Sequence, residues 1–373
     1  MTVSPAPTVP LFTAEAASFG LDLAPLLQGV VDSGRYILGP RVQAFEAAFA
    51  AYVGVAHGIG VANGTDALEL ALRALDIGPG RRVVTVANAG FYGSTAICAV
   101  GATPVYVDVD EVSLTLSPAG LAEALAGQAV DAVIVTHLYG QLADMAAIAD
   151  LCSVAGVPLI EDGAQAHGAR RDGRAAGAWG RIGAFSFYPT KNLGALGDGG
   201  ALVTNDAALA DRLRSLRQYG WCAKYEVALA GGRNSRLDEL QAAVLSAKLP
   251  LLDAANTQRR AVAARYHAAL ADLPLRLPPS TGEDFVAHLY VLRTPYRAAL
   301  QAHLAAAGIA CEVHYPVADH RQPLLAGSAA APILPVSEAA CTQVLTLPCF
   351  PGLRDQQIEQ VIAAVRDFHE GGA

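Results

Sequence analysis

The stretch Phe185-Ser-Phe-Tyr-Pro-Thr-Lys-Asn-Leu-Gly-Ala-Leu-Gly-Asp-Gly-Gly200 places a single lysine, Lys191, among small, aromatic and hydroxyl residues. The first charged residue after this lysine is Asp198. A lysine in such poorly solvated surroundings loses stability as the ammonium, so its pKa falls and its amine becomes a nucleophile toward carbonyl compounds. The stretch therefore fits a lysine that forms a Schiff base, and it fits equally a lysine in a glycine-rich surface loop.

Around this stretch, apolar β-branched runs alternate with helical patterns through the first two-thirds of the chain. The runs expected as strands are Arg82–Ala87, Thr103–Asp108, Asp131–Thr136 and Val157–Glu161. Their near-continuous Val and Ile content predicts strands that are buried on both faces, as in a mainly parallel sheet covered by helices. We expect this α/β unit to extend from about residue 50 to about residue 245.

A long helical run over Leu237–Leu249 ends just before Pro250, and we place the change of domain there. A large domain is therefore predicted over residues 1–249 and a small α+β domain over residues 250–373. In the small domain the patterns predict helices at Asp253–Leu270, Tyr296–Ala307 and Asp355–Phe368, and strands at Phe285–Leu292 and Ile309–Tyr315. The N-terminal segment, about residues 1–50, is expected to pack against this small domain.

The composition narrows the class of protein. Hydrophobic residues make up 53% and charged residues 16%, which is typical of a globular chain. No apolar run reaches the length that spans a membrane, and the first ten residues lack the basic region of a signal peptide. The six cysteines are scattered without a C-x-x-C pair, which favours reduced thiols in the cytoplasm. The net charge of −8 argues against a nucleic-acid partner, and no Cys or His pair has the spacing of a metal site.

Asp162 ends a predicted buried strand, and in open α/β sheets ligands gather at the carboxyl ends of the strands. A carboxylate there can pair with a cationic ring nitrogen of a bound cofactor. Asp162 stands before Gly-Ala-Gln-Ala, however, and the same residue could simply cap a helix.

The stretch Ala62-Asn-Gly-Thr-Asp-Ala-Leu68 comes just before a strongly helical run. Gly64 and Thr65 would leave free backbone N–H groups at the start of that helix, which suits a phosphate group. Ser186 could place a hydroxyl on the same phosphate. The stretch lacks the Gly-Lys-Ser/Thr end of a nucleotide P-loop. An ordinary capped helix, without a phosphate, could have the same sequence pattern.

Several aromatic residues add to this set. Phe91 and Tyr92 follow a predicted strand and could stack on a cofactor ring. Tyr188, His314 and Tyr315 are polar aromatic residues in apolar settings, where a core or interface role is the alternative.

Taken together, and in their order along the chain, these motifs closely resemble those of the DegT/DnrJ/EryC1/StrS family of sugar aminotransferases. The resemblance covers nearly the whole chain and rests on Tyr36–Pro40, Val61–Leu68, Glu161–Gly168, Phe185–Gly200, Asn234–Ala243 and Val313–Pro316. It implies the fold-type I (aspartate aminotransferase-like) architecture and the cofactor pyridoxal 5′-phosphate (PLP), which becomes pyridoxamine 5′-phosphate in the half-reaction.

The resemblance also implies roles for individual residues. Lys191 forms the Schiff base, Asp162 pairs with the pyridine nitrogen, and Gln165 lies beside the ring hydroxyl. The phosphate is held by Gly64, Thr65 and Ser186, together with Asn234 of the partner subunit, so that a homodimer shares its active sites. Many relatives carry Thr-Phe or Thr-Tyr where this chain has Asn88-Ala-Gly-Phe-Tyr92, which leaves the stacking residue open; we favour Tyr92 over Phe91.

The sequence is most similar to the branch that aminates nucleotide-linked 3-keto-6-deoxyhexoses, since it has Gln165 where other branches often place His. This implies glutamate as amino donor, 2-oxoglutarate as its product and a dTDP-linked sugar as acceptor. The residues expected near the sugar and the diphosphate are Tyr188, Lys224, His314 and Tyr315. Amination at C4 or on a cyclitol is the alternative, and a non-catalytic PLP-binding regulator is a further one. A sugar dehydratase is disfavoured, because similar dehydratases replace the lysine with His.

Overall fold

The Val- and Ile-rich runs form the centre of a seven-stranded sheet with the order β1-β9-β8-β5-β4-β2-β3. The computed structural model of the protein describes residues 8–325 and 332–371. The strands are β1 (His57–Val61), β2 (Arg82–Thr85), β3 (Thr103–Tyr106), β4 (Ala132–Thr136), β5 (Leu159–Asp162), β8 (Ile182–Ser186) and β9 (Gly200–Thr204). Strand β9 is antiparallel to both of its neighbours, and all other neighbouring pairs are parallel.

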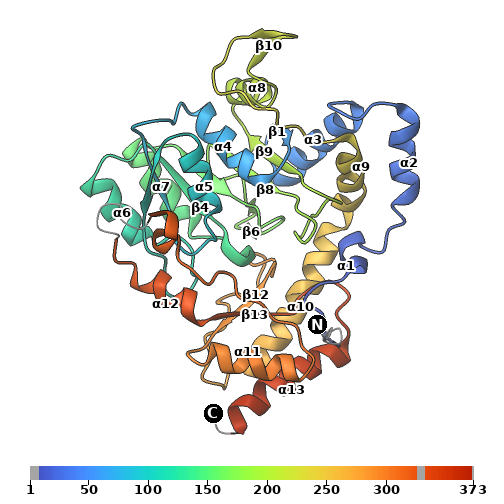
Figure 1. Ribbon diagram of the computed structural model, residues 1–373, viewed down its shortest axis with the longest axis vertical. Helices are drawn as coiled ribbons and strands as arrows, with labels where there is room; N and C mark the ends of the chain where they lie inside the picture. The colour runs from blue at the N-terminus through green and yellow to red at the C-terminus, as the bar shows by residue number, and fades with distance from the viewer. Residues whose placement is uncertain (1–7, 326–331, 372–373) are drawn as a thin grey trace.

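Helices cover both faces of this sheet (Figure 1). Val133 and Val135 of β4 pack in one core, which includes residues of α6 (Pro118–Gly127) and α7 (Met145–Ala155). Ile134 between them packs in the opposite core, which is formed with α4 (Gly64–Ala74), α5 (Tyr92–Ala99) and α8 (Ala207–Leu216). The prediction of a mainly parallel sheet buried on both faces is therefore confirmed.

The N-terminal segment divides between two cores. Val9 packs in the core of the small domain, and so does Ala16 of α1 (Ala14–Ser18). In contrast, α3 (Pro40–Val53) packs on the large sheet, where the ring of Phe49 lies 5.0 Å from that of Phe185. Helix α2 (Ala24–Ser33) contacts α9 (Glu239–Lys248). The expectation that the whole segment packs with the small domain is wrong for α2 and α3, because the apolar face of α3 covers β8 and β9.

The C-terminal part builds a separate core around the antiparallel pair β12 (Tyr290–Arg293) and β13 (Val344–Leu347). The helices there are α10 (Leu252–Leu270), α11 (Arg297–Ala306), α12 (Pro335–Gln343) and α13 (Asp355–Glu370), and they lie in the lower half of Figure 1. The short helix η2 (Leu249–Leu251) separates α9 from α10 at the position of Pro250. The division at residues 249 and 250 remains a prediction.

Two predicted strands differ from the structure. The run Phe285–Leu292 becomes a strand only at Tyr290, because Ala287 adopts a positive φ of 45° that interrupts the extended backbone. The run Ile309–Tyr315 makes only single bridges, from Ile309 to Val9 and from Glu312 to Thr346. Its apolar pattern arises because its apolar residues pack against the core, and the pattern does not indicate a continuous strand.

The remaining elements are short. They are η1 (Leu138–Gly140), β6 (Arg170–Arg171), β7 (Arg174–Ala175), β10 (Trp221–Ala223), β11 (Glu226–Val227), η3 (Asp319–Arg321) and η4 (Pro323–Leu325). The β10–β11 hairpin projects from the body beyond α8 (Figure 1). Within the described ranges, no helix combines the length and the apolar character needed to cross a bilayer. Residues 1–7, part of the segment expected to lack a signal peptide, lie outside the described residues.

Candidate active site

Lys191 lies in the loop between β8 and β9, and the part of the loop that follows it directly is buried. Asn192, Leu193, Gly194 and Ala195 are all buried, and Lys191 itself is partly buried. A Cβ atom on Gly194 would lie 2.4 Å from the carbonyl oxygen of Pro189, so the tight fold of the loop requires glycine there. Burial lowers the pKa of Lys191 from its ordinary 10.5 to about 8, and the negative charge of Asp162 opposes part of this shift. The burial around Lys191 favours the Schiff-base interpretation, and the role of this lysine stays a prediction.

Asp162 is the last residue of β5 and pairs in register with Thr136, the last residue of the adjacent β4. Its carboxylate accepts hydrogen bonds from the Thr136 hydroxyl at 3.3 Å and from the Ala164 N–H group at 3.1 Å. Burial raises the pKa of Asp162 above its usual value, while the Ala164 bond and the positive charge of Lys191 oppose the rise. Residues 163–169 form turns and no helix, so Asp162 is not a helix cap.

The phosphate cup expected at Gly64 takes shape where α4 begins. The Asn63 side chain caps the helix by accepting a hydrogen bond from the Asp66 N–H group at 2.8 Å. Gly64 lies directly against Ser186, the last residue of β8, since a Cβ atom on Gly64 would be only 2.6 Å from the Ser186 Cβ. The first N–H groups of α4 and the Ser186 hydroxyl thus lie at one place, beside the strand end that carries Asp162. This arrangement fits a phosphate group.

Gln165 connects the strand ends to two tyrosines. Its Oε1 atom accepts a hydrogen bond from the Tyr139 N–H group at 2.6 Å, and its Nε2 atom donates to the Tyr315 hydroxyl at 3.2 Å. The Tyr315 ring contacts the Tyr92 ring edge-on, with 5.9 Å between the centroids. His314 lies next to them, with its Nδ1 atom 2.8 Å from the Thr346 hydroxyl. The structure therefore brings Gln165, Tyr92, His314 and Tyr315 together.

Phe91 differs from Tyr92. It occupies the N-cap position of α5 with a positive φ of 68°. Tyr92 is the first residue of the helix, and its ring, not that of Phe91, contacts Tyr315. Tyr92 as the residue that stacks on the cofactor ring stays a prediction.

Three predicted residues do not join this cluster within the chain. Tyr188 is 53% exposed. Lys224 lies in the projecting hairpin, where its ammonium group is 5.1 Å from the centre of the Tyr225 ring. Asn234 is exposed as well, although the neighbouring Ser235 hydroxyl accepts a hydrogen bond from the Ala62 N–H group at 3.1 Å. The loop that carries Asn234 is thus tied to the edge of the cup.

The sequence analysis missed the residues that hold the strand ends in place. His137 follows Thr136, and its Nε2 atom lies 3.0 Å from Glu161, the residue before Asp162. Its Nδ1 atom accepts a hydrogen bond from the Ala143 N–H group, so Nε2 is the protonated nitrogen that donates to Glu161. Thr136 and His137 could have been found, because both stand at the end of a predicted strand.

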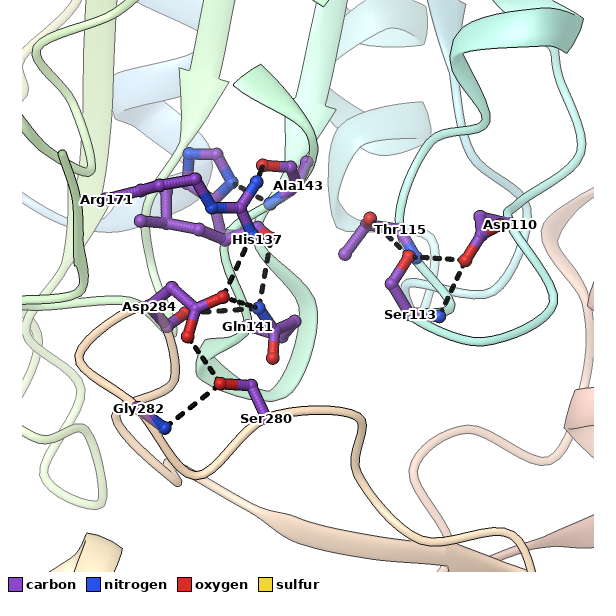
Figure 2. Close-up of polar contacts among 11 residues, drawn as sticks. Asp110, Ser113, Thr115, His137, Gln141, Ala143, Arg171, Ser280, Gly282 and Asp284 are labelled. Carbon is purple, nitrogen blue, oxygen red and sulfur yellow. Dashed lines mark hydrogen bonds and ion pairs between the residues drawn. The ribbon is translucent and has the colours of Figure 1, made fainter. Parts of the chain in front are cut away.

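A polar brace supports the loop that follows β4 (Figure 2). The Asp284 carboxylate accepts hydrogen bonds from Gln141 at 3.1 Å and from Arg171 at 2.9 Å, and Arg171 also donates to the Ala143 carbonyl oxygen at 3.1 Å. The loop carries Tyr139 in η1, so the brace stabilises the wall that contacts Gln165.

A carboxylate at a strand end beside a lysine of lowered pKa is the arrangement that PLP-dependent transamination needs. The carboxylate keeps the ring nitrogen protonated, and the amine forms the Schiff base. The residues present fit this cofactor, and the fold and site define a fold-type I PLP-dependent aminotransferase. The chain belongs to the DegT/DnrJ/EryC1/StrS aminotransferase family, whose sequence profile matches residues 21–366.

Three similar proteins illustrate the relationship. The dTDP-3-amino-3,4,6-trideoxy-alpha-D-glucose transaminase of Streptomyces venezuelae is 46% identical over 98% of this chain and 97% of its own. A pleiotropic regulatory protein of Geobacillus stearothermophilus is 43% identical over 92% of this chain and 93% of its own. The crystal structure of S. venezuelae DesV in complex with a ketimine intermediate has a TM-score of 0.94 at 46% identity, covering 98% of this chain and 99% of that chain. The protein is thus a sugar aminotransferase.

Proposed function

We propose that this enzyme transfers the amino group of glutamate to the C3 carbonyl of a dTDP-linked 3-keto-6-deoxyhexose. The observation that carries the proposal is the 46% identity, over 98% of the chain, to a transaminase named for a dTDP-3-amino-trideoxyglucose. The site supports the reaction type, because Lys191 and Asp162 lie close enough for each charge to shift the pKa of the other.

Lys191 and Asp162 divide the chemistry between them. PLP, when bound, supplies the electron sink for the carbanion that transamination requires. The Lys191 Nζ atom would hold the cofactor and would move a proton, and its pKa of about 8 suits this role near neutral pH. Asp162 holds a proton on the ring nitrogen, and Thr136 fixes the orientation of the carboxylate.

The other residues bind and orient. Gly64, Thr65 and Ser186 hold the phosphate at the start of α4, where the helix dipole favours an anion. Gln165 would lie beside the ring hydroxyl of bound PLP, and Tyr92 would stack on the ring. On the substrate side, Tyr188, His314 and Tyr315 contact the sugar and the diphosphate, together with Lys224.

The proposal includes a homodimer in which Asn234 completes the phosphate site of the partner. In support, the hairpin that carries Lys224 also exposes Tyr225 and Val227, which are 75% and 65% exposed. Apolar side chains gathered on a projecting element are typical of an interaction surface. We place the enzyme in the cytoplasm, and the six free cysteines support a reducing compartment.

The experiment that tests the substrate runs the reaction in reverse. The holoenzyme is mixed with 2-oxoglutarate and a panel of dTDP-, UDP- and GDP-linked amino sugars with the amino group at C3 or C4, and glutamate is measured. The proposal expects dTDP-3-amino-6-deoxyhexoses to give the highest kcat/KM. A clear preference for C4-amino sugars or for an aminocyclitol would favour the alternative acceptors.

The similarity to a protein named as a regulator supplies the second candidate, a non-catalytic PLP-binding protein. Binding alone does not require a lysine of lowered pKa beside a ring-nitrogen carboxylate. A glutamate half-reaction separates the two candidates. An enzyme converts bound PLP to pyridoxamine 5′-phosphate and releases 2-oxoglutarate, whereas a regulator does neither with any amino donor.

A further inference from the structure

Asp319 has no role in the proposed reaction, yet its carboxylate lies at the start of the helix that carries Tyr92. It is 1% exposed and stands at the first position of η3, shortly after Tyr315. Its Oδ1 atom accepts a hydrogen bond from the Phe91 N–H group at 2.9 Å, and its Oδ2 atom accepts one from the Ser94 hydroxyl at 2.7 Å. Its own N–H group donates to the Ala87 carbonyl oxygen at 2.7 Å. Three contacts therefore join η3 to the segment around α5.

Helix α5 depends on this contact because it has no cap of its own. Phe91 occupies the N-cap position and has no side-chain acceptor for the free N–H groups of the first turn. Its φ of 68° is a costly conformation for a residue other than glycine. A negative charge at the N-terminus of a helix also interacts favourably with the helix dipole. Asp319 accepts the N–H group of the N-cap residue and the Ser94 hydroxyl, and so anchors the start of α5 from a segment 228 residues further along the chain.

We propose that Asp319 is the positioning residue for Tyr92, which it holds against Tyr315 by fixing the first turn of α5. The inference rests on the proposed function in one respect, namely that Tyr92 stacks on the cofactor ring. The packing at this place leaves little freedom, since a Cβ atom on Gly90 would lie 3.0 Å from the Tyr315 ring. The segments that carry Tyr92 and Tyr315 therefore depend on Asp319 for their relative position.

Asp108 provides a matched control. Its carboxylate accepts hydrogen bonds from the Val336 and Ser337 N–H groups, both at 2.9 Å, and so caps α12 from a distant segment. Asp108 makes no hydrogen bond to α5 among the described residues. Its loss should destabilise the fold by a similar mechanism and leave Tyr92 in place.

The test measures the dissociation constant of the apoprotein for PLP, together with its thermal unfolding. Asp319→Leu should raise the dissociation constant about 3- to 10-fold, the effect of losing one aromatic stacking contact. Asp319→Asn should stay near the wild-type value, because Oδ1 still accepts from Phe91 and the Ser94 hydroxyl can turn to accept. Asp108→Leu should lower the Tm and leave the dissociation constant unchanged.

A double-variant cycle decides whether Asp319 acts through Tyr92. The Asp319→Leu/Tyr92→Ala protein should bind PLP no more weakly than Tyr92→Ala alone, because the contact that Asp319 positions is already gone. Additive effects of the two substitutions would overturn the proposal. So would an unchanged dissociation constant in a folded Asp319→Leu protein. Ser94→Ala removes the Oδ2 contact together with the hydrogen bond that Ser94 accepts from the Tyr106 hydroxyl. It leaves the Oδ1 contact with Phe91 in place and should raise the constant about 2-fold, which keeps the test available if Asp319→Leu does not fold.

A failure of the proposed function is distinguishable from a failure of this inference. If the wild-type protein bound no PLP at all, the proposed function would fall. Hydrogen exchange of the apoprotein would still report on Asp319, since its loss should speed exchange of the Phe91 N–H group, which donates to Asp319, while Asp108→Leu should not. Unchanged exchange there in Asp319→Leu would overturn the positioning role without reference to any cofactor.

Discussion

Gly64 lies so close to Ser186 that a Cβ atom at position 64 would come within 2.6 Å of the Ser186 Cβ. The first residue of α4 and the last residue of β8 are therefore in direct contact, although 122 positions separate them in the chain. This contact forms the cup that we assign to the phosphate of PLP.

The contact predicts that Gly64→Ala weakens PLP binding. The added methyl group must displace Ser186, and overpacking of this kind costs about 1–3 kcal/mol. We expect the dissociation constant for PLP to rise by about 5-fold or more. Gly127→Ala is the control, because that glycine at the end of α6 has open space around it and its replacement should leave binding unchanged. If the two variants bound PLP with equal affinity, the contact between Gly64 and Ser186 would not form the phosphate-binding site.

Asp162→Asn should slow the reaction without unfolding the protein. The substitution removes the charge that keeps the ring nitrogen protonated, while the amide can retain the hydrogen bonds with Thr136 and Ala164. Loss of one charge-assisted hydrogen bond is worth roughly 1.5–3 kcal/mol, which corresponds to about a 10- to 150-fold loss in kcat. The check is kcat alongside thermal unfolding. Near-normal kcat in a folded variant would reduce Asp162 to a residue that only holds the turn after β5.

The pKa of Lys191 predicts how covalent attachment of PLP depends on pH. Because burial lowers this pKa to about 8, the free amine accumulates as pH rises through 8, far below the 10.5 of an ordinary lysine. The initial rate at which the apoprotein attaches PLP should therefore rise to a plateau with an inflection near pH 8. Asp162→Asn should move the inflection to lower pH, since the Asp162 charge stabilises the ammonium form. An inflection near pH 10 would show that Lys191 is an ordinary solvated lysine.

Part of the site followed from strand ends. Asp162 could be proposed from the sequence because it ends a predicted strand, and parallel strands bring their carboxyl ends to one edge of the sheet. Lys191 and Ser186 are proposed from the composition of their stretch and from the family resemblance, since β8 is not among the predicted strands. Asp319 could not be proposed from the sequence, since it reaches α5 only through the folded contact between distant segments. Strand β1 could not be predicted from the sequence either. It contains Gly58, and a Cβ atom on this glycine would lie 2.4 Å from the Glu46 carbonyl oxygen. Glycines that allow such close approach interrupt the apolar run by which a buried strand is recognised.

The shared-site dimer predicts that an inactive chain and a weakened chain restore activity when they are mixed. Asn234→Ala should weaken PLP retention by one neutral hydrogen bond, about 1 kcal/mol, with the fold intact because the residue is exposed. In a hybrid of Lys191→Ala and Asn234→Ala chains, one site carries both lesions and the other carries neither. If Asn234→Ala alone is substantially impaired, activity should recover toward one intact site per hybrid. Hybrids confirmed by tagged pull-down that show no recovery would place Asn234 in its own subunit's site or in none.

The most direct test of the central claim identifies the lysine that carries the cofactor. The chain has only three lysines, Lys191, Lys224 and Lys248, so the experiment has few possible outcomes. Lys224 is exposed on the hairpin, and Lys248 is buried with its ammonium group donating to the Gly194 carbonyl oxygen. The holoprotein is reduced with borohydride, digested, and examined by mass spectrometry for a phosphopyridoxyl group. The account predicts the label on Lys191 alone and none on a Lys191→Ala protein. A label on Lys224 or Lys248, or a wild-type protein that takes up no label, would contradict it.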